Sequence, residues 1–110
     1  MPTFYIKASD RLPALQATLT DGNGAPVDLT TSTGVTFNMK NSAAALTINN
    51  GTCSYVGAQT TGQVSYAWAG GDTATPGTYM GEFVVTWPGG LQERFPNGDN
   101  IVVIILANLG

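Results

Sequence analysis

The side chains that could carry out chemistry are few, and their types restrict what they can do. The chain has 110 residues, no histidine and a single cysteine, Cys53. Without histidine there is no Ser-His or Cys-His nucleophile pair and no His-ligated metal. One cysteine forms neither an intramolecular disulfide nor a Cys₂ or Cys₄ metal site. Histidine-based catalysis and cysteine-rich metal binding are therefore excluded.

The carboxylates remain as candidates for acid–base chemistry, as in a glycosidase, which needs two of them flanking one bond. Nothing in the spacing selects a pair among Asp72, Glu82, Glu93 and Asp99. We expect Glu82 and Glu93 to be cross-strand surface partners of Arg94 or Lys40. Asp21–Gly24 begins like a calcium loop, but Ser32 stands where the twelfth-position acid is required, so we expect a hairpin turn instead.

Cys53 and the glycine pairs offer no clearer reaction centre. Cys53 lies at an alternating strand position with no basic neighbour to lower its pKa, so we expect a buried small hydrophobic residue. Gly70-Gly71 and Gly89-Gly90 lack the following Lys-Ser/Thr of a phosphate-binding loop. The sequence therefore predicts a protein that is not an enzyme and holds no metal or cofactor.

The charge balance limits the possible partners. Only four residues are basic and seven acidic, a net charge of −3, and 10% of residues are charged. Soluble domains average about 25%. Nucleic-acid binding needs clustered Lys and Arg, which this chain lacks. The longest apolar run, Ile101–Ala107, is far shorter than the roughly 20 residues of a membrane-spanning helix. With no signal peptide at the N-terminus, we expect synthesis in a cytoplasm, no membrane partner, and a binding or structural role.

Alternation of apolar and polar residues with period two recurs along the chain and predicts strands. The clearest runs are residues 15–19, 35–39, 64–68, 79–87 and 91–95. Turn signals separate them, at Asp21–Gly24, Asn49–Gly51, Pro76-Gly77, Pro88–Gly90 and Pro96–Gly98. A helical turn is expected only at residues 42–45. The pattern predicts one all-β domain over residues 1–110, an immunoglobulin-like antiparallel β-sandwich of seven to eight strands.

Aromatic residues at the alternating positions predict the core. Tyr79 begins the longest strand, after a Pro-Gly turn, where immunoglobulin-type sandwiches place a tyrosine whose hydroxyl bonds to upstream backbone. We expect Tyr79 to form this tyrosine corner and to belong to the structural core with Phe37, Trp68 and Phe83. Trp87 is the candidate for contact with a ligand such as a sugar ring, although core packing is the usual role of such residues.

The last predicted strand, Ile101–Leu106, is apolar on both faces. A two-layer sandwich covers only one face of a strand, so either another layer or a neighbouring chain must cover the second. If the strand lies at a sheet edge, it could also pair directly with a neighbouring subunit. The candidate interface residues are Ile101, Val102, Val103, Ile104, Ile105 and Leu106.

The order of motifs resembles the phage baseplate upper protein N-terminal-like family, small immunoglobulin-like domains of tailed-phage virions. Three blocks carry the resemblance: Phe4 to Asp21-Gly22 followed by Pro26–Thr30; Gly62 to Thr86, with Val64, Tyr66, Trp68, Asp72 and Pro76–Tyr79; and Phe95–Gly98. The family's Gly-Asp-Thr appears here as Ser9-Asp10-Arg11, and its Gly-Ala after Asp-Leu-Thr is replaced by Thr31–Gly34. These departures lie at loops and leave open which partner is bound.

The resemblance implies a non-enzymatic phage structural protein, located in the virion, that docks onto or oligomerises within a larger assembly. Its partners would be further copies of itself, forming a homo-oligomer, or baseplate, tail, neck or capsid proteins, and a capsid decoration role also stays open. The sequence ends soon after the last predicted strand, so no attached receptor-binding region is expected. The alternative is a β-sandwich that binds a carbohydrate or a host receptor, with Trp87 as a contact.

Overall fold

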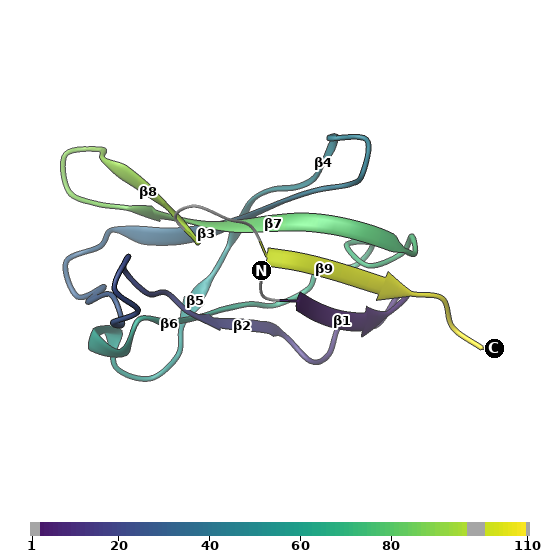
Figure 1. Cartoon of the computed structure of the whole chain (residues 1–110), viewed down its shortest axis with the longest axis horizontal. Helices are drawn as coiled ribbons and strands as arrows, with labels where there is room; N and C mark the ends of the chain where they lie inside the picture. Colours follow the sequence, from purple (N-terminus) through teal and green to yellow (C-terminus); the bar gives the residue numbers. More distant parts are fainter. Residues whose placement is uncertain (1–2, 97–100, 110) are drawn as a thin grey trace.

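Alternating side chains produce two β-sheets in the computed structural model, which describes residues 3–96 and 101–109 (Figure 1). The larger sheet has the order β1-β9-β7-β3-β4, with β8 also paired to β7, and the smaller has the order β2-β6-β5. The strands are β1 (Thr3–Lys7), β2 (Leu15–Thr18), β3 (Gly34–Lys40), β4 (Leu46–Thr52), β5 (Ser54–Tyr55), β6 (Gln63–Tyr66), β7 (Gly77–Thr86), β8 (Gln92–Phe95) and β9 (Ile101–Leu106). The predicted all-β sandwich is confirmed.

The long strand β7 organises the larger sheet. Its residues Met80–Thr86 pair with β3 on one side. On the other side, Gly77–Gly81 pair with β9 and Phe83–Thr86 pair with β8. Because β8 and β9 share one flank of β7, every strand of this sheet except β1 and β4 bonds directly to β7.

Two details of the predicted architecture are wrong. The described residues contain nine strands, not seven or eight, because a strand as short as Ser54–Tyr55 has too few residues for alternation to reveal it. The sandwich is also not wholly antiparallel, since β1 runs parallel to β9. A parallel pair needs a long connection, and nearly the whole chain separates these strands, so no local pattern indicates their pairing. The immunoglobulin-like topology stays a prediction.

Aromatic rings join the two sheets. The Phe37 ring of β3 lies 5.0 Å from Phe83 of β7, 5.1 Å from Tyr66 of β6 and 6.3 Å from Trp68, measured between ring centroids. Phe37, Phe83, Trp68 and Tyr79 are all buried, which confirms them as core residues. The Tyr79 hydroxyl donates to the Thr75 carbonyl at 2.6 Å, so the predicted tyrosine corner contact is present.

The connection from β1 to β2 is tied to the loop that follows β6. Trp68 Nε1 donates to the Pro13 carbonyl and Arg11 Nε donates to the Trp68 carbonyl, both at 3.1 Å. The hydroxyl of Thr73, which is 1% exposed, donates to the Asp10 carbonyl at 2.7 Å. These bonds fix the connection between β1 and β2 against the loop after β6. They therefore help to hold β1 at the edge of the larger sheet.

The predicted turn at Asn49–Gly51 is wrong, because these residues lie inside β4. Phe37 pairs with Gly51 and Met39 with Ile48, so β4 has one extra residue opposite Asn38, which is a β-bulge. Asn50 has φ of 55° and its N–H donates to Asn38 Oδ1 at 2.7 Å. An Asn-Gly pair tolerates positive φ, and both hairpin turns and bulges use that conformation, so the dipeptide alone does not distinguish them.

The helical turn expected at residues 42–45 is also wrong; this segment is the hairpin turn between β3 and β4. Asn41 Oδ1 accepts the N–H groups of Ala43 and Ala45, each at 3.0 Å. Asp21 Oδ1 accepts those of Asn23 and Ala25 in the same way, at 2.8 and 3.1 Å, which confirms the predicted turn at Asp21–Gly24. The helix in the described residues is the short 3₁₀ segment Gln59–Thr61.

The packing of Phe37 against β7 predicts a large effect of one methyl group. A Cβ at Gly81 would lie 2.6 Å from Phe37 Cζ and 2.8 Å from Cε1. Because Phe37 is fully buried, its ring has no free space to move into. We expect Gly81→Ala to lower the free energy of unfolding by about 1–3 kcal/mol, measured by urea denaturation. Gly34→Ala in β3 is the control, since its Cβ would meet nothing within 4 Å. Equal stability of the two variants would contradict this packing.

Candidate functional site

The two faces of β9 have different surroundings. Ile101, Val103 and Ile105 are buried and belong to the core, whereas Val102 and Ile104 are half-buried and Leu106 is 41% exposed. Interface roles predicted for Ile101, Val103 and Ile105 are therefore wrong, because their side chains fill the space between the sheets. Any partner that docks on the face of β9 can use only Val102, Ile104 and Leu106.

The position of β9 within the sheet also rules out direct pairing of this strand with a neighbouring subunit. This strand lies between β7 and β1 and is hydrogen-bonded to both (Figure 1). It is therefore not an edge strand, and its backbone is not available to a neighbouring subunit. The edge of the sheet on this side is β1.

The outward side chains of β9 continue into those of its neighbours. In the register of the sheet, Val102 lies between Thr3 of β1 and Met80 of β7, and Ile104 lies between Tyr5 of β1 and Thr78 of β7. Tyr5 is 60% exposed and Met80 40% exposed. We call this apolar surface the outer patch; it consists of Tyr5, Met80, Val102, Ile104 and Leu106.

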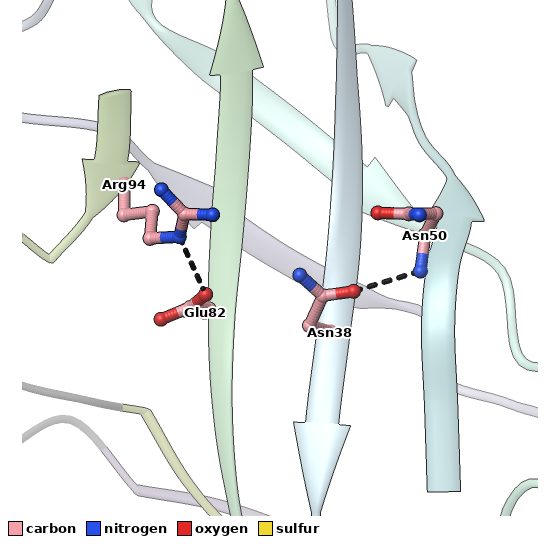
Figure 2. Close-up of polar contacts among 4 residues, drawn as sticks. All are labelled: Asn38, Asn50, Glu82 and Arg94. Atoms are coloured by element: carbon pink, nitrogen blue, oxygen red, sulfur yellow. Dashed lines mark hydrogen bonds and ion pairs between the residues drawn. The ribbon is translucent and has the colours of Figure 1, made fainter. Parts of the chain in front are cut away.

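A polar row borders the outer patch, and its members are paired within the chain. Figure 2 shows it crossing four strands, from Arg94 of β8 through Glu82 of β7 and Asn38 of β3 to Asn50 of β4. Arg94 Nε donates to Glu82 Oε2 at 3.1 Å, and Asn38 Oδ1 accepts the Asn50 N–H (Figure 2). This confirms the expectation that Glu82 pairs with a basic residue. A polar margin beside an apolar centre is the usual anatomy of a protein interface.

The outer face is hollowed beside the outer patch, at the hairpin of β3 and β4. This hollow has a volume of about 640 Å³. Its wall combines the apolar side chains of Ala44, Leu46 and Met80 with the amides Asn38, Asn41 and Asn49 and with Lys40 and Glu82. The hollow shares Met80 with the outer patch, so the two features form one continuous surface.

The carboxylates of Asp72 and Glu93 take part in separate structural contacts. Asp72 Oδ2 accepts the Tyr66 hydroxyl at 2.6 Å and the Ala69 N–H at 2.8 Å. Burial, followed by this bond to Asp72, raises the pKa of the Tyr66 hydroxyl. Glu93 accepts a bond from Trp87, and Asp99 lies outside the described residues. Within residues 3–96 and 101–109, no three acidic or cysteine side chains are grouped as metal ligands.

Trp87, the candidate ligand contact, is half-buried against the core. Its indole Nε1 donates to Glu93 Oε1 at 3.3 Å. The side chain does not line the hollow on the outer face. The structure therefore does not bring the predicted aromatic contact together with the polar groups that could bind a sugar.

Comparison with protein-family models, with curated proteins and with solved structures found no match for this chain. In the part of the chain that the structure describes, no helix has the length and apolar character needed to cross a membrane.

The sequence did not indicate that Tyr5, Met80 and the hollow lie together beside β9, although Tyr5 is a candidate surface aromatic. Tyr5 lies in a short strand of five residues and Met80 in the longest strand, but the pairings that bring them beside Ile104 and Val102 are long-range. The available signal was the alternation along this strand, which places Met80 on the face opposite the buried Tyr79 and Phe83. Alternation shows which face of the sheet Met80 lies on, but it does not show which strands lie beside it.

Cys53 provides a prediction about pH. Its thiol is half-buried, and burial raises the pKa from 9.0 to about 12. Because the folded pKa exceeds the unfolded value, the stability associated with Cys53 is intact below about pH 9 and declines as pH rises from 9 towards 12. We expect a disulfide reagent at pH 8 to label the native thiol about a thousandfold more slowly than the urea-unfolded chain.

The Cys53→Ala variant is the control for both measurements. Its free energy of unfolding should fall less steeply than that of the unsubstituted chain above pH 9. Rapid labelling of the native protein, at the rate of the unfolded chain, would show that the thiol is not desolvated.

Proposed function

We propose that this protein is a non-enzymatic structural component of a tailed-phage virion that attaches to a larger protein assembly through the outer patch. The observation that carries the docking role is the contiguous exposure of Tyr5, Met80 and Leu106 around the half-buried Val102 and Ile104. Large apolar side chains that gather on one face, with a polar margin, mark interaction sites in soluble proteins. The virion context is supported by the resemblance of the ordered sequence blocks to baseplate domains.

The charge distribution is suited to attachment by a flat sheet face. Glu82 and Arg94 neutralise each other within the chain, so a partner can cover them without supplying a matching charge. Val84 faces outward opposite Arg94 and is nevertheless only 3% exposed. The apolar surface left to a partner is therefore concentrated at β1, β9 and the first half of β7.

The alternative function, carbohydrate or receptor binding, is favoured by one observation, the composition of the hollow. Asparagine amides and a lysine can bond to sugar hydroxyls, and the apolar Met80 and Leu46 can contact the carbon face of a ring. The hollow has no aromatic residue among its lining residues, and Trp87 lies elsewhere. We therefore place the structural role first.

Incorporation into particles tests the structural role. Virus-like particles assembled from the gene cluster that encodes the chain should contain it, as measured by quantitative mass spectrometry of gradient-purified material. Ile104→Lys places a charge in the centre of the outer patch and should lower its copy number at least about tenfold. Leu109→Lys is the control, because Leu109 is fully exposed and outside the patch.

Three results would oppose the proposal. They are absence of the chain from particles, equal incorporation of both lysine variants, and failure of Ile104→Lys to keep the native circular dichroism spectrum. In the first case, binding of the purified chain to a glycan array that is lost in Asn49→Ala would favour the carbohydrate alternative.

A further inference from the structure

β1 is the edge of the larger sheet on the side of the outer patch, and one side of its backbone is unpaired among residues 3–96 and 101–109. The Ala8 N–H donates to the Leu106 carbonyl at 2.8 Å, so the backbone groups of Ala8 point towards β9. The N–H and C=O groups of successive residues point to opposite sides of a strand, so those of Phe4 and Ile6 also point towards β9. Thr3, Tyr5 and Lys7 then direct their N–H and C=O groups away from the sheet. The Lys7 carbonyl accepts the Asp10 N–H, which closes this side of β1 at its C-terminal end.

The other sheet edges carry features that discourage strand addition. β4 has the bulge at Asn49 and Asn50, which interrupts its register. β8 carries the exposed charges Glu93 and Arg94. In the smaller sheet, β5 has only two residues and β2 only four. Bulges, charges and short length are the usual means by which proteins protect sheet edges. β1 pairs with β9 over five consecutive residues without a register shift, so its edge is regular.

We propose that β1 pairs with β1 of a second copy of this chain, antiparallel and about a two-fold axis at Tyr5. This arrangement is isologous, because each copy offers the same edge. Tyr5 lies opposite Tyr5 of the partner subunit and exchanges both backbone bonds with it. The N–H of Lys7 and the C=O of Thr3 supply the bonds on either side.

Charge selects this register among the antiparallel alternatives. Lys7 is the only charged residue of β1. Centring the pair on Tyr5 places each Lys7 opposite a threonine, whereas centring it on Lys7 would place two ammonium groups opposite each other. Like charges directly opposite are destabilising in antiparallel pairs. Beyond Lys7 the Ser9 N–H is bonded to the Thr73 carbonyl, so the free edge extends no further in that direction.

The pairing would join the two larger sheets into one and set two outer patches side by side, with the exposed Tyr5 rings at the junction. An edge contact of this size is smaller than a stable interface, so we expect a dissociation constant on the order of 100 µM for the purified chain. This inference does not depend on the virion role, since it concerns only the backbone edge and a second copy.

Sedimentation equilibrium of matched variants tests the pairing. Tyr5→Pro removes an N–H that points away from β9, and proline is accepted on edge strands, so the domain should fold but the dissociation constant should rise at least about tenfold. Tyr5→Thr is the control: it removes the ring but keeps the N–H, and the constant should change by no more than about fivefold. Leu109→Lys, which alters a fully exposed residue outside β1 and the outer patch, should leave the dimer unchanged.

Hydrogen exchange of the unsubstituted chain provides a readout that needs no variant. The amides of Tyr5 and Lys7 should exchange more slowly at high protein concentration than at low, while other edge amides, such as those of β4, stay constant. A chain that is monomeric at every concentration, an unchanged constant in Tyr5→Pro, or concentration-independent exchange of Tyr5 would each overturn the proposal. Because the purified chain is used, these results are distinct from a failure of particle incorporation.

Discussion

The close approach of the Phe37 ring to the backbone of β7 at Gly81 is the constraint on which the rest of the structure depends. The ring occupies the volume that any side chain at residue 81 would need. It also contacts Phe83, Tyr66 and Trp68, so a single side chain connects β3, β7 and the smaller sheet. With β7 held in this position, its other flank pairs with β8 and β9, and β9 in turn pairs with β1.

The sparse charged and polar groups make contacts within the chain that stabilise the fold. The Asp72 carboxylate joins the Tyr66 hydroxyl to the loop after β6, Glu82 neutralises Arg94, and Asn41 closes a hairpin. What remains at the surface is a sheet face with few unpaired charges and a group of apolar side chains. Such a face is suited to contact with other protein, which is the basis of the proposed structural role.

The sequence predicted those parts of the fold that depend on local periodicity. Alternation along β3, β6 and β7 identified the buried rows, and the Pro-Gly turn before Tyr79 identified its hydroxyl contact. The bulge at Asn50 was missed because positive φ is common to turns and bulges. The position of β9 was missed because pairing of β1 with β9 is a long-range contact. The candidate site was predicted only in part, for the same reason. The sequence identifies β9 as an apolar strand, but the neighbouring strands determine which of its side chains are covered.

We propose that the two faces of β9 serve different purposes: the inner face stabilises the fold, and the outer face contacts a partner. Val102 and Val103 are adjacent and chemically identical, but Val103 is fully buried and Val102 only half-buried. Urea denaturation of Val102→Thr and Val103→Thr in the isolated chain compares the faces directly. We expect Val103→Thr to lower the free energy of unfolding by about 2 kcal/mol and Val102→Thr to lower it by less than about 0.5 kcal/mol. Equal losses would contradict the proposed difference between the two faces.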